Sequence, residues 1–434
     1  GNQNNAFCYY AMSINQGANN VAMGHNAMQG EVGVSTSDSI GIGAYALRNV
    51  SGTASHNVAI GYGALQGPGA GTTASYNTAV GRSAGDGTTT GHSNVYMGYK
   101  AGYTNTTYTG NVYIGMEAGY ANEMNLNTFI GNLAGRYATG VTKSVYIGSQ
   151  AGGEAASTGD YNTFVGVTAG YGITTGYQNV GMGIDALRNV QDGYDNVALG
   201  SQALDSVTSG YQNIGIGISG GATLSSGYLN TFVGAFAGLD STTGIWNTFI
   251  GAYAGTGNTS GKHNVSVGYG SLQENQEGDF NVAIGRYALY NTNPADTTGE
   301  NVAVGDQAGY TNTTGIRNVF VGHKAGYAST TASNNIFIGR EAGVANTTGT
   351  ANVAVGMRAL DANTIGNYNT AIGQQALGTN IDGDYNTAIG FEALEVHEPA
   401  DNEGTNTAVG ALALTATTTG TGNTFKVALY TSSS

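Results

Sequence analysis

The chain has 434 residues, of which 73 are glycine, three are proline and 9% are charged. Thirteen Lys and Arg against 27 Asp and Glu give a net charge of −14, which excludes a general nucleic-acid binder, because such proteins need a basic surface to neutralise phosphates. No apolar run of about 18 residues occurs, so we expect no membrane insertion, and a single cysteine, Cys8, excludes a disulfide framework within the chain.

A short motif recurs along almost the whole sequence. Counted from its Asn as position 0, it reads Asn, Thr or Val, a small or aromatic residue, Ile, Val or Met, Gly, two variable residues, Ala, and Gly or Leu, as in Asn230–Gly238. It occurs 24 times, and from Asn162 to Asn281 every step is 17 residues. A fixed short period is typical of a solenoid, whose units contact mainly their neighbours. The sequence therefore predicts an all-β, elongated parallel β-solenoid (a β-roll) of about 24 coils with a 17-residue period.

Positions 1 to 3 of each copy are β-forming residues between Asn and Gly, which predicts a short strand followed by a turn. Positions 1 and 3 share one face of that strand, and position 2 points to the other. Positions 1 and 3 are almost always Val, Ile, Thr, Met or Leu, and position 2 is never charged. We therefore expect burial on both faces, as in parallel sheets, with successive coils about 4.8 Å apart.

In chain order, residues 1–56 hold less regular coils, with Ser39 in the place of Asn, and residues 57–422 hold regular repeats. After the copy at Asn406 the pattern fails, so residues 423–434 are expected to begin a different segment. Three steps are 20 residues long and contain all the prolines, Pro68, Pro294 and Pro399. Proline cannot donate a hydrogen bond to a neighbouring strand, so each of these steps predicts a loop that bulges outward.

The Asn at position 0 has two interpretations, a row of ligand-binding amides or a structural ladder in which stacked amides bond coil to coil. We favour the ladder. Its regular part comprises Asn162, Asn179, Asn196, Asn213, Asn230, Asn247, Asn264 and Asn281.

Positions 2 and 8 vary together. All nine copies with an aromatic residue at position 2, such as Phe232, have Gly at position 8, here Gly238; twelve of the fifteen copies with a small residue, such as Ala371, have Leu or Met there, here Leu377. Close packing tolerates neither doubled volume nor a hole, so we infer that the two positions fill one site, within a coil or between chains. The exceptions are the copies at Asn77, Asn213 and Asn301. In the last of these we expect Tyr310 to fill the gap.

Tyrosines recur just before the Asn of many copies, and the pattern places them along one edge of the solenoid. They are Tyr194, Tyr211, Tyr228, Tyr368 and Tyr385. Such a row could form a glycan-contact stripe, but packing between coils or chains is the favoured interpretation.

Catalysis is not indicated. The six histidines lie in different coils without a recurring partner, and no nucleophilic or paired-carboxylate arrangement is recognisable. The acidic stretch 395–403 has no calcium-loop spacing and is best explained as a solvated loop. We therefore expect no enzyme activity, no cofactor and no metal.

Copies such as Asn281–Leu289, which reads NVAIGRYAL, resemble the repeat region of phage tail fibres and the head of trimeric autotransporter adhesins. The adhesin repeats form a left-handed parallel β-roll, although their period is usually shorter than the one found in this chain. The resemblance covers about residues 4–420 and implies a homotrimer on a virion surface or outside a cell. No chaperone or membrane anchor of those families is recognisable.

The leading hypothesis is therefore a structural and adhesive fibre shaft that projects from a virion or cell and contacts surface glycans or a receptor. The alternative is a self-assembling extracellular filament, in which uncapped solenoids stack end to end. Both hypotheses imply self-association, as a homotrimer or as an end-to-end polymer.

Overall fold

The computed structural model describes residues 3–13, 15, 17–30, 35–49, 53–69, 72–153, 156–294, 298–396, 405–415 and 422–426. Within these ranges the chain contains strands and turns but no helix, and it forms a parallel β-solenoid of about 23 turns with a period of about 17 residues. It divides into two compact units, residues 1–215 and 216–434, which are described separately. The predicted all-β parallel solenoid is thus confirmed.

Every strand has three residues, at positions 1 to 3 of its copy. Unit 1 contains β1 (Asn5–Phe7), β2 (Val21–Met23), β3 (Ile40–Ile42), β4 (Val58–Ile60), β5 (Thr78–Val80), β6 (Val95–Met97), β7 (Val112–Ile114), β8 (Thr128–Ile130), β9 (Val145–Ile147), β10 (Thr163–Val165), β11 (Val180–Met182) and β12 (Val197–Leu199). Unit 2 contains β14 (Thr231–Val233), β15 (Thr248–Ile250), β16 (Val265–Val267), β17 (Val282–Ile284), β18 (Val302–Val304), β19 (Val319–Val321), β20 (Ile336–Ile338), β21 (Val353–Val355), β22 (Thr370–Ile372), β23 (Thr387–Ile389), β24 (Thr407–Val409) and β25 (Thr424–Lys426). The short strand β13 (Ile214–Ile216) spans the division between the units.

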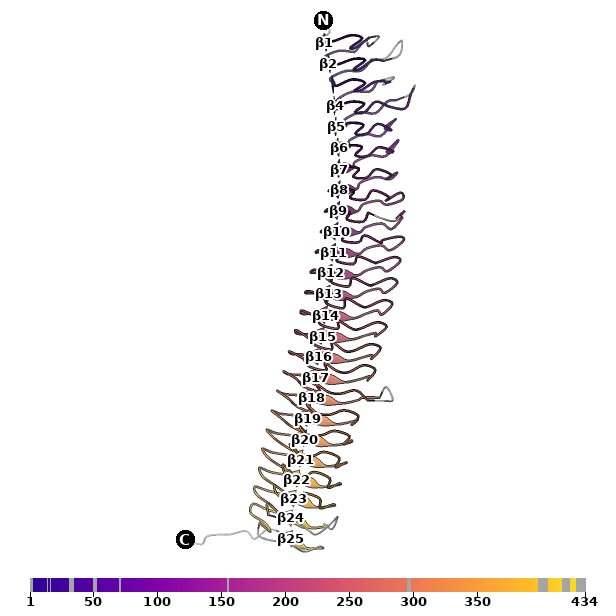
Figure 1. The fold of residues 1–434 in the computed structure, drawn as a ribbon. Coiled ribbons are helices and arrows are strands. Elements are labelled where there is room, and N and C mark those ends of the chain that lie inside the picture. Colours follow the sequence, from indigo (N-terminus) through magenta and orange to yellow (C-terminus); the bar gives the residue numbers. More distant parts are fainter. Residues whose placement is uncertain are drawn as a thin grey trace, which may run out of the picture. The chain divides into compact units, whose positions relative to one another are not determined.

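Within each unit the strands pair in parallel and in register, one coil above the next (Figure 1). Thr248 faces Val265 and Ile250 faces Val267, for example. Because the same position of each copy pairs with its counterpart, every position forms a column along its unit. A column can therefore be filled by stacked side chains of one kind.

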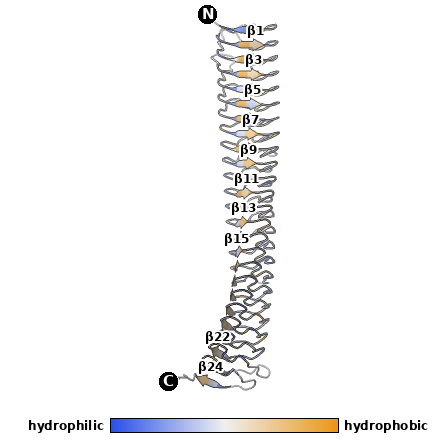
Figure 2. Ribbon diagram, turned by 90° about the vertical axis from the view of Figure 1, so that its left-hand side faces the viewer, coloured by the Kyte–Doolittle hydropathy of each residue, from blue (hydrophilic) through white to orange (hydrophobic). Residues whose placement is uncertain are grey.

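The core is built from positions 2, 7 and 8, whose Ala, Leu and aromatic side chains are buried. Positions 1 and 3 are partly or well exposed in nearly every strand, so the expectation of burial on both faces is wrong for the single chain. The reason is that each coil folds back over one side of its strand only. Ile250 and Ile284, both at position 3, remain 40% and 39% exposed, and many strand arrows of unit 1 are orange in Figure 2.

The turn by which each coil folds back over its strand depends on residues with positive φ at fixed positions. The position 4 glycine Gly251 has φ +130°, and a Cβ there would lie 2.6 Å from the backbone oxygen of Gly268 in the next coil. Position 8 is left-handed as well, with φ 58° at Gly238 and φ 52° at Leu377. Glycine suits both sites without strain, whereas leucine in this conformation costs about 1–2 kcal/mol.

At the ends of the repeat region the strands keep the same register. β2 and β3, in the region expected to be less regular, pair as the later strands do. At the other end β25 pairs in register with β24, and the Asn423 N–H donates to Asn406 Oδ1 at 3.0 Å. The pairing of strands therefore extends to β25, while the rest of the segment 423–434, which was expected to differ, lies outside the described residues. Pro68 and Pro294 lie outside strands in the longer steps, and Pro399 lies outside the described residues.

Candidate functional site

The position 0 asparagines form a buried hydrogen-bonded column in each unit. In unit 1 Oδ1 of Asn162 accepts from the backbone N–H of Asn179 at 2.9 Å and from its Nδ2 at 3.1 Å, while Asn179 Nδ2 also donates to the Gly193 carbonyl at 2.8 Å. In unit 2 Asn247 makes the same contacts with Asn230. The eight asparagines of the predicted ladder are fully buried. A soluble ligand cannot reach amides in this arrangement, so the geometry favours the ladder over a ligand row.

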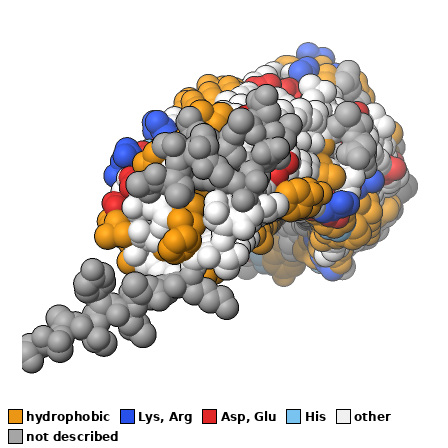
Figure 3. All heavy atoms as spheres, turned by 90° about the horizontal axis from the view of Figure 1, so that it is seen from below, with side chains coloured by type: hydrophobic (Ala, Val, Ile, Leu, Met, Phe, Trp, Pro, Cys, Tyr) orange, Lys and Arg blue, Asp and Glu red, His pale blue; other side chains and the backbone are white. Residues whose placement is uncertain are grey.

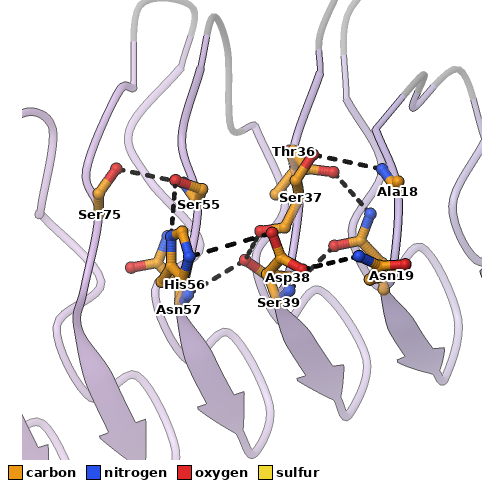
Figure 4. A network of polar contacts seen from close by, with 11 residues as sticks. Ala18, Asn19, Thr36, Ser37, Asp38, Ser39, Ser55, His56, Asn57 and Ser75 are labelled. Atoms are coloured by element: carbon orange, nitrogen blue, oxygen red, sulfur yellow. Dashed lines mark hydrogen bonds and ion pairs between the residues drawn. The ribbon is translucent and has the colours of Figure 1, made fainter.

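Serine can replace asparagine in this column (Figure 4). Ser39 N–H donates to Asn20 Oδ1 at 3.0 Å, its Oγ accepts from the Asn57 N–H at 3.1 Å, and the same hydroxyl donates to the Ser37 carbonyl at 2.9 Å. The serine thus continues the hydrogen-bonded column to the next coil, but unlike asparagine it has no Nδ2 group to donate to a turn carbonyl.

A second buried amide column, eleven residues after the first, was not predicted. In unit 2 Asn275 Nδ2 donates to Asn258 Oδ1 at 3.0 Å, and Asn363 Nδ2 donates to Asn346 Oδ1 at 2.8 Å. Each also donates to a turn carbonyl three residues later, as Asn275 does to Gly278. The recurring pattern Asn-x-x-Gly, as in Asn275–Gly278 and Asn363–Gly366, carried the signal, but its Asn has mostly polar neighbours and is easily taken for part of an exposed loop.

Positions 2 and 8 meet inside the same coil. A Cβ added at Gly238 would lie 2.6 Å from two ring carbons of Phe232, and the other aromatic copies show the same close approach. In the coil of β22, Ala371 is small and the buried Leu377 side chain occupies the space. The two classes of coil are therefore two ways of filling one volume.

In the exceptional copies, side chains of the neighbouring coils fill the space that positions 2 and 8 leave empty. At Gly309 an added Cβ would lie 2.6 Å from the Phe320 ring of the following coil and 2.9 Å from Leu289 of the preceding one. Tyr310 does not fill this gap, contrary to expectation. Its ring lies on the outer side, stacked between Tyr290 and Tyr327, because its neighbour at position 8 already turns the chain outward.

The buried tyrosines differ in how their hydroxyls are bonded. Tyr113 donates to Asn122 Oδ1 at 2.7 Å, whereas the fully buried Tyr146 hydroxyl has no hydrogen-bond partner among the described residues. Burial raises the pKa of the Tyr146 hydroxyl well above the ordinary tyrosine value. Its ring packs between Phe129 and Phe164, with centroids 4.6 and 5.3 Å away.

The surface tyrosines occupy two columns rather than one edge, because some lie one residue and others two residues before the Asn. In unit 1 Tyr194 stacks on Tyr211 with centroids 4.8 Å apart and planes 2° apart. In unit 2 Tyr368 stacks on Tyr385 at 5.0 Å and 3°, and Tyr228 meets Trp246 edge to face. Stacked rings cover one another's faces, so a sugar would meet mostly ring edges. This geometry favours packing between coils over a glycan stripe.

The outward strand face is an uncharged, partly exposed surface that runs along each unit. We define it as positions 1 and 3 of β2–β12 in unit 1 and of β14–β24 in unit 2. All of these residues are Val, Ile, Leu, Met or Thr, and none is charged. In a soluble protein a continuous apolar surface of this extent marks an interaction site.

Chemistry-bearing groups are sparse elsewhere. Among the described residues no three His, Cys, Asp or Glu side chains come together in a way that could hold a metal ion, and no helix is long and apolar enough to cross a membrane. From residue 397 to 403 the acidic stretch lies outside the described residues. No protein-family model matches the chain, and no curated protein matches it.

Proposed function

We propose that the chain is a structural fibre shaft whose copies associate side by side through the outward strand face, as a homotrimer on a virion or cell surface. The observation that carries this proposal is the uncharged, largely aliphatic column of each unit, whose residues are partly or well exposed in the single chain. A partner that covers such a column needs the same period along the same length. A second copy of the chain meets that requirement.

The energetics favour association of many coils at once. Full burial of an Ile side chain contributes about 1.5–3 kcal/mol, so covering the part of Ile250 that remains exposed would contribute about 1 kcal/mol. Association itself costs about 4–15 kcal/mol, so a few coils are insufficient and about ten or more in parallel are needed. The eleven strands β14–β24 satisfy this condition within one unit.

The buried amide columns support the same role. The position 0 column bonds successive coils to one another, and the second column bonds some neighbouring coils of unit 2. These amides are buried, so they stiffen a unit and are not accessible to a ligand. The number of chains in the assembly rests on the resemblance to trimeric fibre proteins.

The proposal is tested by native mass spectrometry and electron microscopy of the full chain. We expect a discrete trimer of fixed length; a monomer at micromolar concentration would refute lateral association, and indefinite filaments would favour the end-to-end alternative. Ile250→Lys with Ile284→Lys should dissociate the assembly, because two charges would then face an apolar partner. Thr243→Lys, an exposed threonine in the same unit that lies off the strand face, is the matched control and should leave the mass unchanged.

Adhesion to surface glycans is the less favoured role of the exposed pair Tyr368 and Tyr385, whose rings stack on one another, and it is tested by substitution. If the pair contacts glycans, the doubly substituted Tyr368→Ala, Tyr385→Ala protein loses glycan-array signals that the parent gives. Equal signals would assign the pair to coil packing alone.

A further inference from the structure

Side-by-side association through the outward strand face leaves one question open, namely how the copies align along their length. Positions 1 and 3 of β14–β24 are drawn from Val, Ile and Thr alone. A copy displaced by several coils would therefore make almost the same apolar contacts. Register is weakly specified when neighbouring pairings are this similar, so another feature must set it. The inference below rests on the proposed function.

Position 5, directly after the position 4 glycine, borders the outward strand face. In unit 2 it is apolar or small in most coils, for example Ile218, Tyr269, Met357 and Phe391, all of them exposed. Four successive coils, those of β17 to β20, depart from this pattern. Their position 5 residues are Arg286, Asp306, His323 and Arg340. We call these four residues the charged block.

The charged block is held in place by ion pairs between coils. Arg286 binds Asp306 side-on, with Nε–Oδ1 2.7 Å and Nη2–Oδ2 3.1 Å, and His323 Nε2 lies 3.7 Å from Asp306 Oδ2. The hydrogen bond from Arg286 also lowers the pKa of the Asp306 carboxyl, so this carboxylate is ionised at neutral pH. The block therefore presents fixed charges beside an otherwise apolar face.

At its β20 end the charged block carries more positive than negative charge. Glu341 is shared by Arg340, at 3.2 Å, and Arg358, at 2.8 Å. Arg286 and Arg340 are each 58% exposed at the side chain, and exposed pairs of this kind stabilise a single chain little. Figure 3 shows such mixed groups of blue and red side chains among orange ones. Their contribution to the fold alone does not explain why they gather beside the strand face.

We propose that the charged block sets the axial register between associated copies of this chain. In register, charged coils face charged coils, and a guanidinium of one copy can reach a carboxylate one coil away on the next copy, because coils are about 4.8 Å apart. If one copy is displaced by four coils relative to the next, its charged block faces the coils of Met357 or Tyr269 and the coils beyond them on the other copy. Its charges then lose their hydration without gaining partners on that copy. Polar residues within apolar interfaces fix register in coiled coils for the same reason.

Cross-linking of mixed chains tests the proposal. In a Cys8→Gly background, which removes the single native thiol, Thr248→Cys and Val319→Cys place thiols at position 1 of β15 and β19, four coils apart. The two variants are unfolded together, refolded as a mixture and oxidised. With the block intact we expect disulfides between identical positions only. With Arg286→Met, Asp306→Ala, His323→Ala and Arg340→Met, residue types that position 5 carries in other coils, disulfides between Cys at 248 and Cys at 319 should rise several-fold.

The ion pair between Arg317 and Glu300 provides the control. Its length of 2.8 Å is close to the 2.7 Å of Arg286–Asp306, and its arginine is similarly exposed, at 54%. It lies just before the Asn column rather than beside the strand face. Arg317→Met with Glu300→Ala should leave the cross-linking pattern of the parent unchanged.

The outcomes distinguish a failure of the register proposal from a failure of lateral association. Disulfides between Cys at 248 and Cys at 319 in the protein with an intact charged block would overturn the register proposal. The same holds if these disulfides do not appear once the charged block is removed and the mass of the assembly is unchanged. Lateral association would stand in both cases. A monomeric mass with no cross-links would overturn lateral association, and the register proposal with it.

Discussion

Removal of the Phe232 ring tests the shared volume of positions 2 and 8 directly. The side chain is fully buried and stacks on Phe249 with centroids 5.5 Å apart. Phe232→Ala should therefore cost about 3–5 kcal/mol, the range for loss of a buried aromatic ring with its cavity. This value applies locally, to the coils on either side of β14.

Gly238→Leu should have opposite effects in the two backgrounds. In the parent an added Cβ would lie 2.6 Å from the Phe232 ring, so overpacking of about 1–3 kcal/mol adds to a left-handed leucine penalty of about 1–2 kcal/mol. In the Phe232→Ala protein the same leucine fills the cavity, gaining about 1.5–3 kcal/mol by burial against the same backbone penalty. A net recovery of about 1 kcal/mol is expected. Leu377, at φ 52° in the equivalent position, shows that the backbone accepts leucine there.

Hydrogen exchange of the β14 and β15 amides is the appropriate measurement, because a stack of coils opens locally rather than in one step. The matched exchange in the coil of β22, Ala371→Phe with Leu377→Gly, should be tolerated better than Ala371→Phe alone. Equal losses from Gly238→Leu in both backgrounds would refute the shared volume, since the coupling free energy between the two positions would then be zero.

Three further predictions concern buried polar groups. Asn264→Leu leaves the backbone N–H of Asn281 unpaired and removes one of the two amides that donate to the Gly278 carbonyl, so it should cost about 1–3 kcal/mol in thermal unfolding. Asn264→Ser should cost less, because serine already occupies this column elsewhere. Tyr146→Phe should stabilise the protein by about 1 kcal/mol because it removes an unpaired hydroxyl, while Tyr113→Phe should destabilise it. The raised pKa of Tyr146 means that stability is lost as pH rises above about 10, where the unfolded tyrosine ionises, so Tyr146→Phe should weaken that alkaline loss. Burial raises the pKa of the half-buried Asp361, which lowers stability above the unfolded carboxyl pKa, so denaturant titration should find Asp361→Asn stabilising at pH 7 and neutral below pH 3.

The architecture could be predicted because the period is visible in residue types. Asn at position 0, Gly at position 4 and the exchange between Phe232 and Gly238 all report contacts that recur in every coil. A contact that recurs in every coil produces a correlation between the residue types at its two positions, even within a single sequence.

Features that depend on direction or on a single coil could not be predicted. Positions 1 and 3 resemble core residues in type. Whether a strand face is covered depends on the direction in which the coil folds back, and the positive φ at positions 4 and 8 sets that direction. Leu377 with a positive φ is not recognisable from its residue type. The gap at Gly309 is filled by Phe320 and Leu289, and Gly85 lies in the same way between Tyr96 and Leu65. Each case involves three different coils, so a comparison of positions 2 and 8 within one copy does not reveal it.

The in-register columns have a consequence for how such a chain can change length. Deletion of one whole 17-residue block, such as 247–263, rejoins every column with its own kind, whereas loss of 16 residues would set Asn against Thr and Gly against Val along the junction. Duplication or excision of complete blocks is therefore nearly silent to the fold and adds or removes one step of about 4.8 Å. The number of coils can therefore change in evolution one complete block at a time without loss of the fold.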